Sequence, residues 1–369
     1  MNGYKSADNP YTLQFSFVPP KLIERAVITS EIIDNFTRQT PTYRGMFITG
    51  VRGSGKTVML GDIRNKISQK KDWVTVDVNP ESNILDSVAR GLYLIPSLKS
   101  LFVKAKLDFS LLGIGVHIER ADLIASNEED ALNMMLRTLK KNGKKVLVTI
   151  DEITYSKDVA RFSHALSSFA NADYDMYVLM TGLLDNIANI KNKKSLTFLY
   201  RAKIRELDAL NVTAIRSDYR NTLGIDEETS QKLAYMTKGY SLAYQALGLH
   251  CWNELCTIKS YDGFDLGTVG EKLDITLAEM AYDKIWDELS TTDKAVLVAM
   301  NDIIRNNSGD SVRVEEIREA LDMTSDVFTT YRKRLIDDGI VEASGYGFLR
   351  FRLPRIEQYI DSVKKNRPF

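Results

Sequence analysis

The stretch "FITGVRGSGKTVML", residues 47–60, decides the fold of this 369-residue chain. Its centre follows the pattern G-x-x-x-x-G-K-[ST], which arises by chance in about one chain in a hundred of this length. The apolar run "MFITG" predicts a buried parallel strand, and the apolar residues after the glycines recur at helical spacing. A strand, a glycine-rich loop and a helix together form a phosphate cradle, because backbone N–H groups and the helix N-terminus face the anion.

The loop predicts a set of nucleotide-binding residues. Lys56 is expected to reach the β- and γ-phosphates of ATP, and the Thr57 hydroxyl is expected to bind Mg²⁺. The other residues of the predicted cradle are Gly50, Arg52, Gly53, Ser54, Gly55 and Val58. The alternative interpretation is a glycine-rich turn between a strand and a helix that holds no ligand.

A second motif, "KKVLVTIDEI" at residues 144–153, places two adjacent carboxylates at the end of an apolar strand. In open α/β sheets the nucleotide binds at the carboxyl ends of the strands, which is where this pattern puts Asp151 and Glu152. Asp151 is expected to hold Mg²⁺ through its water shell, and Glu152 to act as general base on the attacking water. The alternative is a strand that ends in two solvated acids.

Further apolar runs extend the predicted sheet. The run "MYVLMTGLL", residues 176–184, contains Thr181, whose hydroxyl is placed to face the γ-phosphate or the water. The runs at 72–79 and 203–207 are also strand-like. Their alternation with helical segments predicts an α/β fold with a parallel sheet covered on both faces.

Between the glycine loop and the two carboxylates, the piece "KLDFSLLGIGVHIE" at 106–119 alternates apolar and polar residues around two glycines. This pattern predicts a β-hairpin, inserted near 103–120, that either covers the domain or meets a partner or DNA. His117 has no second metal-ligand residue at a suitable spacing, so we expect it to be structural.

Composition limits the partners. The formal net charge is +0, so no global field recruits nucleic acid or an anionic membrane, and any DNA contact must be local. No apolar run approaches the ~18–20 residues of a spanning helix, so we expect a cytoplasmic protein without membrane contact. The length predicts two or three domains. We place their boundaries at 1–210, 211–284 and 285–369.

The last of these segments predicts a winged helix-turn-helix. Three helical patterns beginning near "LSTTDKAVL", "VRVEEIREAL" and "TSDVFTTYRK" are followed by "IVEASGYGFLRFRLP", which is typical of two strands around a Gly-Tyr-Gly turn. Residues 324–355 carry a charge of +2, but residues 286–369 contain thirteen basic and fifteen acidic residues, a charge of −2. That is little charge for a domain that must neutralise many phosphates.

The sequence nevertheless offers individual residues as candidate DNA contacts. A recognition helix and a wing in duplex DNA would use Thr329, Thr330, Arg332, Lys333, Arg350 and Arg352. The alternative is a winged helix that docks on its own ATPase module or on a protein partner.

Together these motifs resemble the AAA+/STAND group of P-loop ATPases, and most closely the prokaryotic ATPases described as origin-recognition-complex-like. "GVRGSGKT" is similar to the Walker A motif of that family, "VLVTIDEI" to Walker B and "VLMTG" to sensor 1. The resemblance implies an ASCE/AAA+ type ATPase domain, a small helical lid and a C-terminal winged helix. It also implies ATP and Mg²⁺ as ligands, ATP hydrolysis to ADP, and a nucleotide-dependent homo-oligomer or protein partner.

Further roles rest on the resemblance alone. Arg25 matches the family arginine on the adenine side, although Glu24 stands where glycine is usual. Arg201 is the candidate for the arginine near the γ-phosphate, ahead of Arg205. The stretch "GYSLAYQALG" is similar to the lid motif G-x-P-x-A, but Ser241 replaces the proline and no sensor 2 arginine follows nearby. This departure predicts slow hydrolysis and a switch, not a fast motor.

Two functions from different classes remain open. The first is an ATP-dependent switch whose winged helix contacts duplex DNA. The second is a STAND-like signalling ATPase whose winged helix makes protein–protein or intramolecular contacts. A P-loop kinase acting on a small molecule is disfavoured by the additional lid and winged helix.

Overall fold

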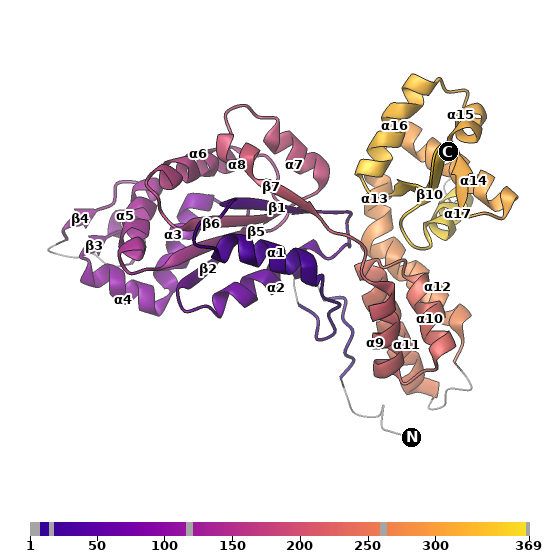
Figure 1. Ribbon diagram of the computed structural model, residues 1–369, viewed down its shortest axis with the longest axis horizontal. Helices are drawn as coiled ribbons and strands as arrows, with labels where there is room; N and C mark the ends of the chain where they lie inside the picture. Colours follow the sequence, from indigo (N-terminus) through magenta and orange to yellow (C-terminus); the bar gives the residue numbers. More distant parts are fainter. Residues whose placement is uncertain (1–7, 15–17, 116–120, 259–263, 367–369) are drawn as a thin grey trace. The chain divides into compact units, whose positions relative to one another are not determined.

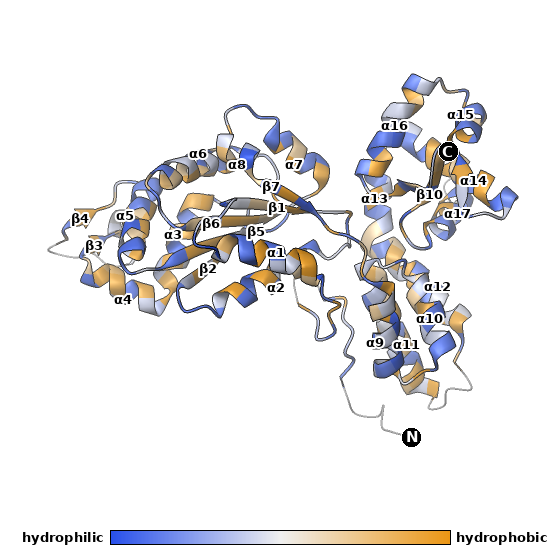
Figure 2. Ribbon diagram, viewed as in Figure 1, coloured by the Kyte–Doolittle hydropathy of each residue, from blue (hydrophilic) through white to orange (hydrophobic). Residues whose placement is uncertain are grey.

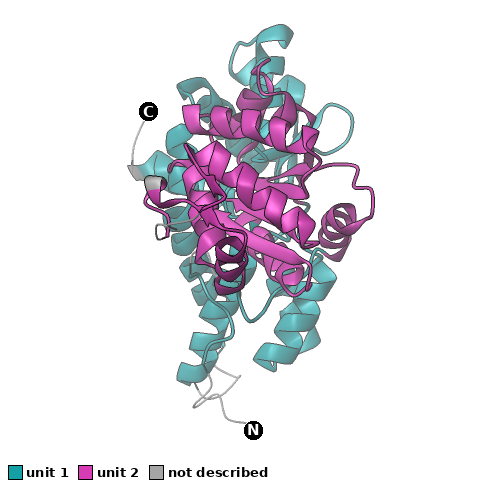
Figure 3. Ribbon diagram, turned by 90° about the vertical axis from the view of Figure 1, so that its left-hand side faces the viewer, with its two compact units in different colours: residues 1–25, 50–55, 208–369 teal, residues 26–49, 56–207 magenta. Residues whose placement is uncertain are grey.

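In the computed structural model the chain divides into two compact units (Figure 3). Unit 2 consists of Ala26–Thr49 and Lys56–Leu207, and unit 1 of Met1–Arg25, Gly50–Gly55 and Asp208–Phe369. The structure describes residues 8–14, 18–115, 121–258 and 264–366.

The sheet of unit 2 has five strands in the order β2-β5-β6-β1-β7, all parallel where they pair, which confirms the predicted α/β fold (Figure 1). The strands are β1 Gly45–Thr49, β2 Trp73–Val78, β5 Lys145–Ile150, β6 Met176–Thr181 and β7 Lys203–Glu206. In the register Ile48 faces Thr181, and Ile150 faces Met180. The carboxyl ends of β5, β6 and β1 therefore lie at the same edge.

Helices cover both faces of this sheet. Phe47 packs into one apolar core, whereas its neighbours Met46 and Ile48 pack into another, because side chains alternate across a strand. Figure 2 shows hydrophobic residues along these strands. The helices are α1 Ala26–Thr37, α2 Lys56–Ser68, α3 Ile84–Leu94, α4 Pro96–Lys104, α5 Glu128–Lys141, α6 Lys157–Asn171, α7 Leu184–Lys191 and α8 Thr197–Arg201.

The predicted β-hairpin near 103–120 is wrong for the residues that the structure describes. Strand β3, Leu107–Asp108, pairs in parallel with β4, Leu123–Ile124, and a 3-10 turn, η1, occupies Ser110–Leu112. The aromatic ring of Phe109 explains the difference, because it packs edge-on against the rings of Tyr93 and Phe102 in the core. The apolar residues of this segment therefore anchor it to the domain. His117 lies outside the described residues.

Unit 1 begins with a helical lid. Its elements are α9 Val212–Leu223, α10 Glu227–Met236, α11 Ser241–Ile258, α12 Leu266–Leu277, the π-helical turn η3 Ala278–Tyr282 and α13 Asp283–Glu288. Tyr11 is buried among these helices, edge-on to the rings of Tyr219 and Tyr244, and its hydroxyl donates to Asp218 at 2.6 Å. These contacts place Tyr11 within the core of the helical part of unit 1.

The rest of unit 1 has the winged helix-turn-helix arrangement. Its elements are α14 Thr291–Asn307, β8 Ser311–Arg313, α15 Val314–Ala320, α16 Ser325–Asp337, β9 Val341–Ala343, β10 Phe348–Phe351 and α17 Ile356–Asn366. Ser290 and Asp293 form a capping box at the start of α14. The stretch "VRVEEIREAL" begins as a strand, and β8 completes an antiparallel sheet in the order β8-β10-β9.

One property of the helices bears on the membrane prediction. Over the described ranges, none of them is long and apolar enough to cross a bilayer.

Candidate nucleotide site

The glycine-rich motif divides between the two units. Residues Gly50–Gly55 belong to unit 1, and Lys56 and Thr57 form the first turn of α2 in unit 2.

In unit 2, the carboxylate of Asp151 joins three of the motifs. It directly follows β5, while Thr181 ends the adjacent strand β6 and Thr57 lies in the first turn of α2. The Thr57 hydroxyl donates to Asp151 Oδ2 at 2.7 Å, and the Thr181 hydroxyl donates to Oδ1. Both carboxylate oxygens therefore accept a hydroxyl, which fixes the orientation of the group.

Glu152 has an unusual backbone conformation. Its φ is 53°, in the left-handed region, which costs about 1 kcal/mol for a residue other than glycine. The Glu152 N–H donates to Thr181 Oγ1 at 2.9 Å, and the Ile153 N–H donates to the Thr181 carbonyl at 2.8 Å. These bonds hold the turn against its strain and leave the Glu152 side chain exposed. Strain of this kind collects at functional sites.

This strain yields a stability prediction. We expect Glu152→Gly to raise the free energy of unfolding by about 1 kcal/mol relative to Glu152→Ala, because only glycine adopts a positive φ without penalty. Both variants lack the carboxylate, so the difference between their free energies of unfolding reports the cost of the positive φ alone. Urea unfolding of the two proteins measures it, and equal stabilities would show that the turn stores no strain.

Lys56 and Thr57 combine features that suit an anion and its metal. The Lys56 side chain is only 8% exposed, at the N-terminus of a 13-residue helix with no acidic residue in its first turn. A helix N-terminus carries partial positive charge, so both features favour phosphate. The Thr57 hydroxyl and the Asp151 carboxylate are oxygen donors, which Mg²⁺ prefers, and Mg²⁺ needs only one or two carboxylates because it keeps several waters. The described residues contain no cluster of three or more His, Cys, Asp or Glu side chains suited to a metal.

In unit 1, the start of α11 binds the outer side of the glycine loop. The Tyr240 hydroxyl donates to the Arg52 carbonyl, the Leu242 N–H to the Gly53 carbonyl at 3.1 Å, and the Ser241 hydroxyl to the Ser54 carbonyl at 2.8 Å. Three successive carbonyls are thus turned toward the lid. In a trans peptide the N–H points opposite to the C=O, so the N–H groups of Gly53 and Gly55 point away from the lid. That is the orientation a phosphate cradle requires.

Two details of the loop fit a polar ligand. Gly53 and Gly55 have φ values of 76° and 91°, which only glycine adopts readily. The buried Ser54 hydroxyl oxygen has no hydrogen-bond partner among the described residues, and a buried hydroxyl without a partner is unfavourable. A phosphate oxygen at the loop would supply that partner.

Arg25 also lies on the outer side of the loop. Its guanidinium donates to the Ser54 carbonyl at 2.9 Å, to Ser241 Oγ at 3.1 Å and to the Asp208 carbonyl at 2.8 Å. Burial lowers the pKa of Arg25 to about 10, against an opposing effect of Asp208, so the group stays charged at neutral pH. The structure shows Arg25 as a residue that positions the loop, a role that the adenine assignment did not anticipate. Sequence reasoning also missed Tyr240, which directly precedes the flagged Ser241.

The two arginine candidates differ in their surroundings. Arg205 lies on β7 and forms an ion pair with Glu31 of α1, within unit 2. Arg201 ends α8 and is exposed. An arginine that acts on a phosphate must have a guanidinium available, which favours Arg201 over Arg205.

The basic residues of the winged helix are mostly engaged. Arg334 pairs with the buried Asp293, Arg350 with Glu342 at 2.6 Å, and Arg355 with Asp274. Arg332 is half-buried, and Arg352, also half-buried, has an interaction of its own. The exposed residues of the predicted DNA set on α16 are Thr329, Thr330 and Lys333. The ion pairs cancel half of the six basic charges between residues 324 and 355.

Comparisons with known proteins agree with this architecture. The ORC2 protein of Aeropyrum pernix, in its ADPNP–ADP complexes, matches with a TM-score of 0.61 and 13% identity over 96% of this chain and 97% of that chain. Its ADP form matches with a TM-score of 0.50 and 13% identity over the same shares. The family model of a domain of unknown function, DUF8462, matches residues 279–360, and no curated protein matches. The chain therefore shares the fold of this ORC2 protein, with its parallel sheet, helical region and C-terminal winged helix.

Proposed function

We propose that this protein is a nucleotide-dependent switch that binds ATP with Mg²⁺ and hydrolyses it slowly. The observation that carries the proposal is the Asp151 carboxylate, held by the hydroxyls of Thr57 and Thr181 directly beside Glu152. The glycine loop with its outward carbonyls and the buried Lys56 support it. The structurally similar ORC2 protein forms complexes with ADPNP and ADP, which supports nucleotide as the ligand.

Each residue has a chemical role in this proposal. Lys56 and the loop N–H groups bind the phosphates, and Thr57 and Asp151 hold Mg²⁺, which neutralises phosphate charge when bound. Glu152 accepts a proton from a water molecule while the oxygen of that water forms a bond to the γ-phosphorus. The bond from the γ-phosphorus to the bridging oxygen breaks, and ADP and inorganic phosphate leave. Thr181 keeps Asp151 and the Glu152 backbone in place, and Arg201 stabilises the transferring phosphoryl group.

The lid is proposed to sense the nucleotide through the loop backbone. The lid segment lacks a sensor 2 arginine, yet Tyr240, Ser241 and Leu242 bind three consecutive loop carbonyls. A change in loop conformation on nucleotide binding therefore acts directly on the start of α11. Such coupling needs no arginine from the lid at the γ-phosphate and is consistent with a low turnover number, below about 1 s⁻¹, the lower end for enzymes.

Tyr240→Phe tests this coupling. The substitution keeps the ring but leaves the Arg52 carbonyl without its donor, which costs about 1–3 kcal/mol when the group is buried. We expect ATP affinity to fall by about fivefold or more, measured by calorimetric titration. Tyr235→Phe is the matched control, because Tyr235 is an exposed residue of the same unit. Equal affinities for the two variants would contradict a role for the Tyr240 hydroxyl.

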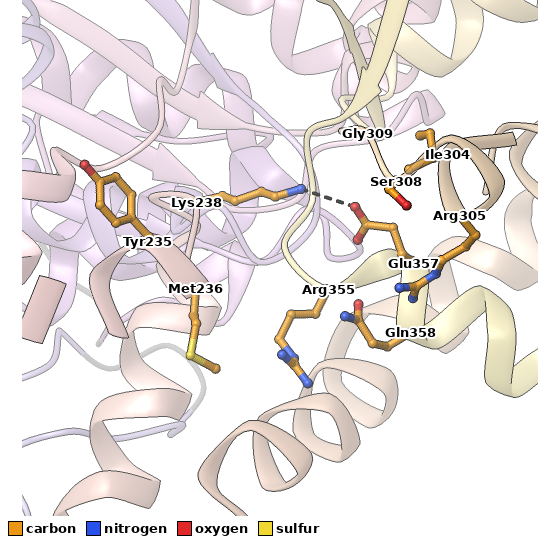
Figure 4. A pocket seen from close by; sticks show the side chains of 10 residues that line it. All are labelled: Tyr235, Met236, Lys238, Ile304, Arg305, Ser308, Gly309, Arg355, Glu357 and Gln358. Carbon is orange, nitrogen blue, oxygen red and sulfur yellow. Dashed lines mark ion pairs between the residues drawn. The ribbon is translucent and has the colours of Figure 1, made fainter. Parts of the chain in front are cut away.

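The favoured output of the switch is intramolecular. Winged-helix residues bind the lid within unit 1: Arg355 pairs with Asp274 through two hydrogen bonds, and Glu357 pairs with Lys238 at 3.6 Å (Figure 4). The Tyr282 hydroxyl also donates to the Pro354 carbonyl at 2.6 Å. A cavity of about 510 Å³ lies there. Figure 4 shows the side chains from both parts that line it. These contacts support a lid and winged helix that respond to nucleotide as one body.

Duplex DNA is the second candidate output. The exposed Thr329, Thr330 and Lys333 lie on α16, the helix in the recognition position, and favour it. ATP hydrolysis by the wild-type protein, measured with and without duplex DNA and with bound nucleotide quantified, separates the outputs. A slow rate that duplex DNA does not change supports the intramolecular switch. A rate that duplex DNA raises supports the DNA-linked switch, and a protein that neither binds nor hydrolyses ATP contradicts the proposed function.

A further inference from the structure

Unit 2 contains a local concentration of positive charge, of which the proposed function uses only Arg201. The segment from residue 186 to residue 205 contains six basic residues and no acidic one, in a chain whose formal net charge is zero. The basic residues are Lys191, Lys193, Lys194, Arg201, Lys203 and Arg205. Within the part of the chain that the structure describes, Arg205 pairs with Glu31, and the other five basic residues form no ion pair.

Two exposed tyrosine rings contact lysines of this basic segment. The Lys193 ammonium lies 4.7 Å from the centroid of the Tyr155 ring, and the Lys191 ammonium lies 5.9 Å from the centroid of the Tyr200 ring. Tyr155 is 43% exposed and Tyr200 is 63% exposed, so ring surface remains open to solvent on both. Lysine and tyrosine thus form two pairs joined through the short segment between Lys191 and Lys193.

The fold fixes the positions of these lysines and tyrosines. Tyr155 lies between β5 and α6, and Tyr200 lies in α8, which packs against both α6 and α7 (Figure 1). The Lys191 ammonium donates to the Ala202 carbonyl at 2.7 Å, which fixes its position. Burial and the nearby Lys203 lower the pKa of Lys191, as expected for a cation without a neutralising carboxylate.

The chemistry of the surface selects one partner. Aromatic rings interleaved with cations bind single-stranded nucleic acid, because bases stack on the rings while the cations bind the phosphates. A duplex keeps its bases stacked internally and would leave the rings unused, and an acidic peptide would use the lysines alone. We propose that Tyr155, Lys191, Lys193, Lys194 and Tyr200, called here the Lys–Tyr surface, bind single-stranded DNA or RNA.

The test uses the full chain and fluorescence anisotropy with labelled dT15, rU15 and a 15-bp duplex. We expect Tyr155→Ala combined with Tyr200→Ala to weaken binding of a single strand by about tenfold or more, and the corresponding Phe variant to bind like wild type, because stacking needs the ring. Any duplex binding should be unchanged by these substitutions. An effect with dT15 identifies DNA as a ligand, and an effect with rU15 identifies RNA.

The electrostatic part has its own variant and control. Lys193→Gln with Lys194→Gln should flatten the plot of log affinity against log salt by about 1.4, since each phosphate contact on a single strand contributes about 0.7. Lys70→Gln with Lys71→Gln removes the same charge from another exposed segment of unit 2 and should leave the slope unchanged. Arg201 is unchanged throughout. Absence of single-strand binding by wild type, or identical binding by wild type and the Ala variant, would overturn the proposal.

Discussion

Glu152→Gln is expected to hydrolyse ATP at least about 100-fold more slowly than wild type while still binding it. A positioned general base contributes about 10²–10⁴-fold to rate, and glutamine cannot accept the proton. The Glu152 interaction with Thr181 uses the backbone N–H, so the amide leaves the network of Thr57, Asp151 and Thr181 intact. Steady-state phosphate release and quantification of bound nucleotide measure the two halves of this result.

The matched control for this prediction is Glu81→Gln. Glu81 is an exposed glutamate of the same unit, in the segment between β2 and α3. Its substitution should change neither binding nor rate. If Glu152→Gln hydrolysed ATP at the wild-type rate, the carboxylate would be a solvated strand end and the base would have to be sought elsewhere.

The second large effect is expected at Gly53. A Cβ at this position would overlap the Tyr240 hydroxyl and lie 2.8 Å from Tyr240 Cζ and 3.2 Å from Leu242 Cβ. Tyr240 is buried and donates to the Arg52 carbonyl, so the ring cannot move without breaking that bond. We expect Gly53→Ala to weaken ATP binding by about tenfold or more, because overpacking of about 1–3 kcal/mol displaces the loop.

Gly347→Ala separates this steric effect from backbone strain. Gly347 has the same φ of 76° as Gly53, but a Cβ there would have nothing within 4 Å. Both variants therefore pay about 1 kcal/mol for the positive φ, and only Gly53→Ala also displaces Tyr240. We expect Gly347→Ala to lose stability but not ATP affinity. Similar ATP affinities for the two variants would show that the loop does not depend on its packing against Tyr240.

The sheet could be predicted from the sequence because four of its strands, β1, β2, β5 and β6, are short and mostly apolar runs next to helical patterns. Long-range packing could not be predicted in the same way. Tyr11 reaches Tyr219 and Tyr244, more than 200 residues away, and no local pattern announces that contact. In the segment around Phe109, apolar and polar residues alternate as they do in a hairpin. The Phe109 ring is nevertheless buried in the core, and the neighbouring strand β3 pairs in parallel with β4.

The candidate site likewise contains residues that local motifs predict and residues that only long-range packing brings together. Thr57, Asp151 and Thr181 each stand at a sequence position that places them at one sheet edge, so their meeting is what the motifs imply. Tyr240 carries no such signal, because its role depends on the approach of α11 to the loop. The charge of the winged helix was also beyond local reasoning, since Arg334 is neutralised by Asp293 from another helix.

The most direct test of the central claim is a calorimetric titration of the wild-type protein with ATP in the presence of Mg²⁺. The account predicts saturable binding with one nucleotide per chain, weakened when Mg²⁺ is removed. A wild-type protein that takes up no ATP under these conditions would contradict the account, because the glycine loop, Lys56 and the Asp151 network would then have no phosphate to hold.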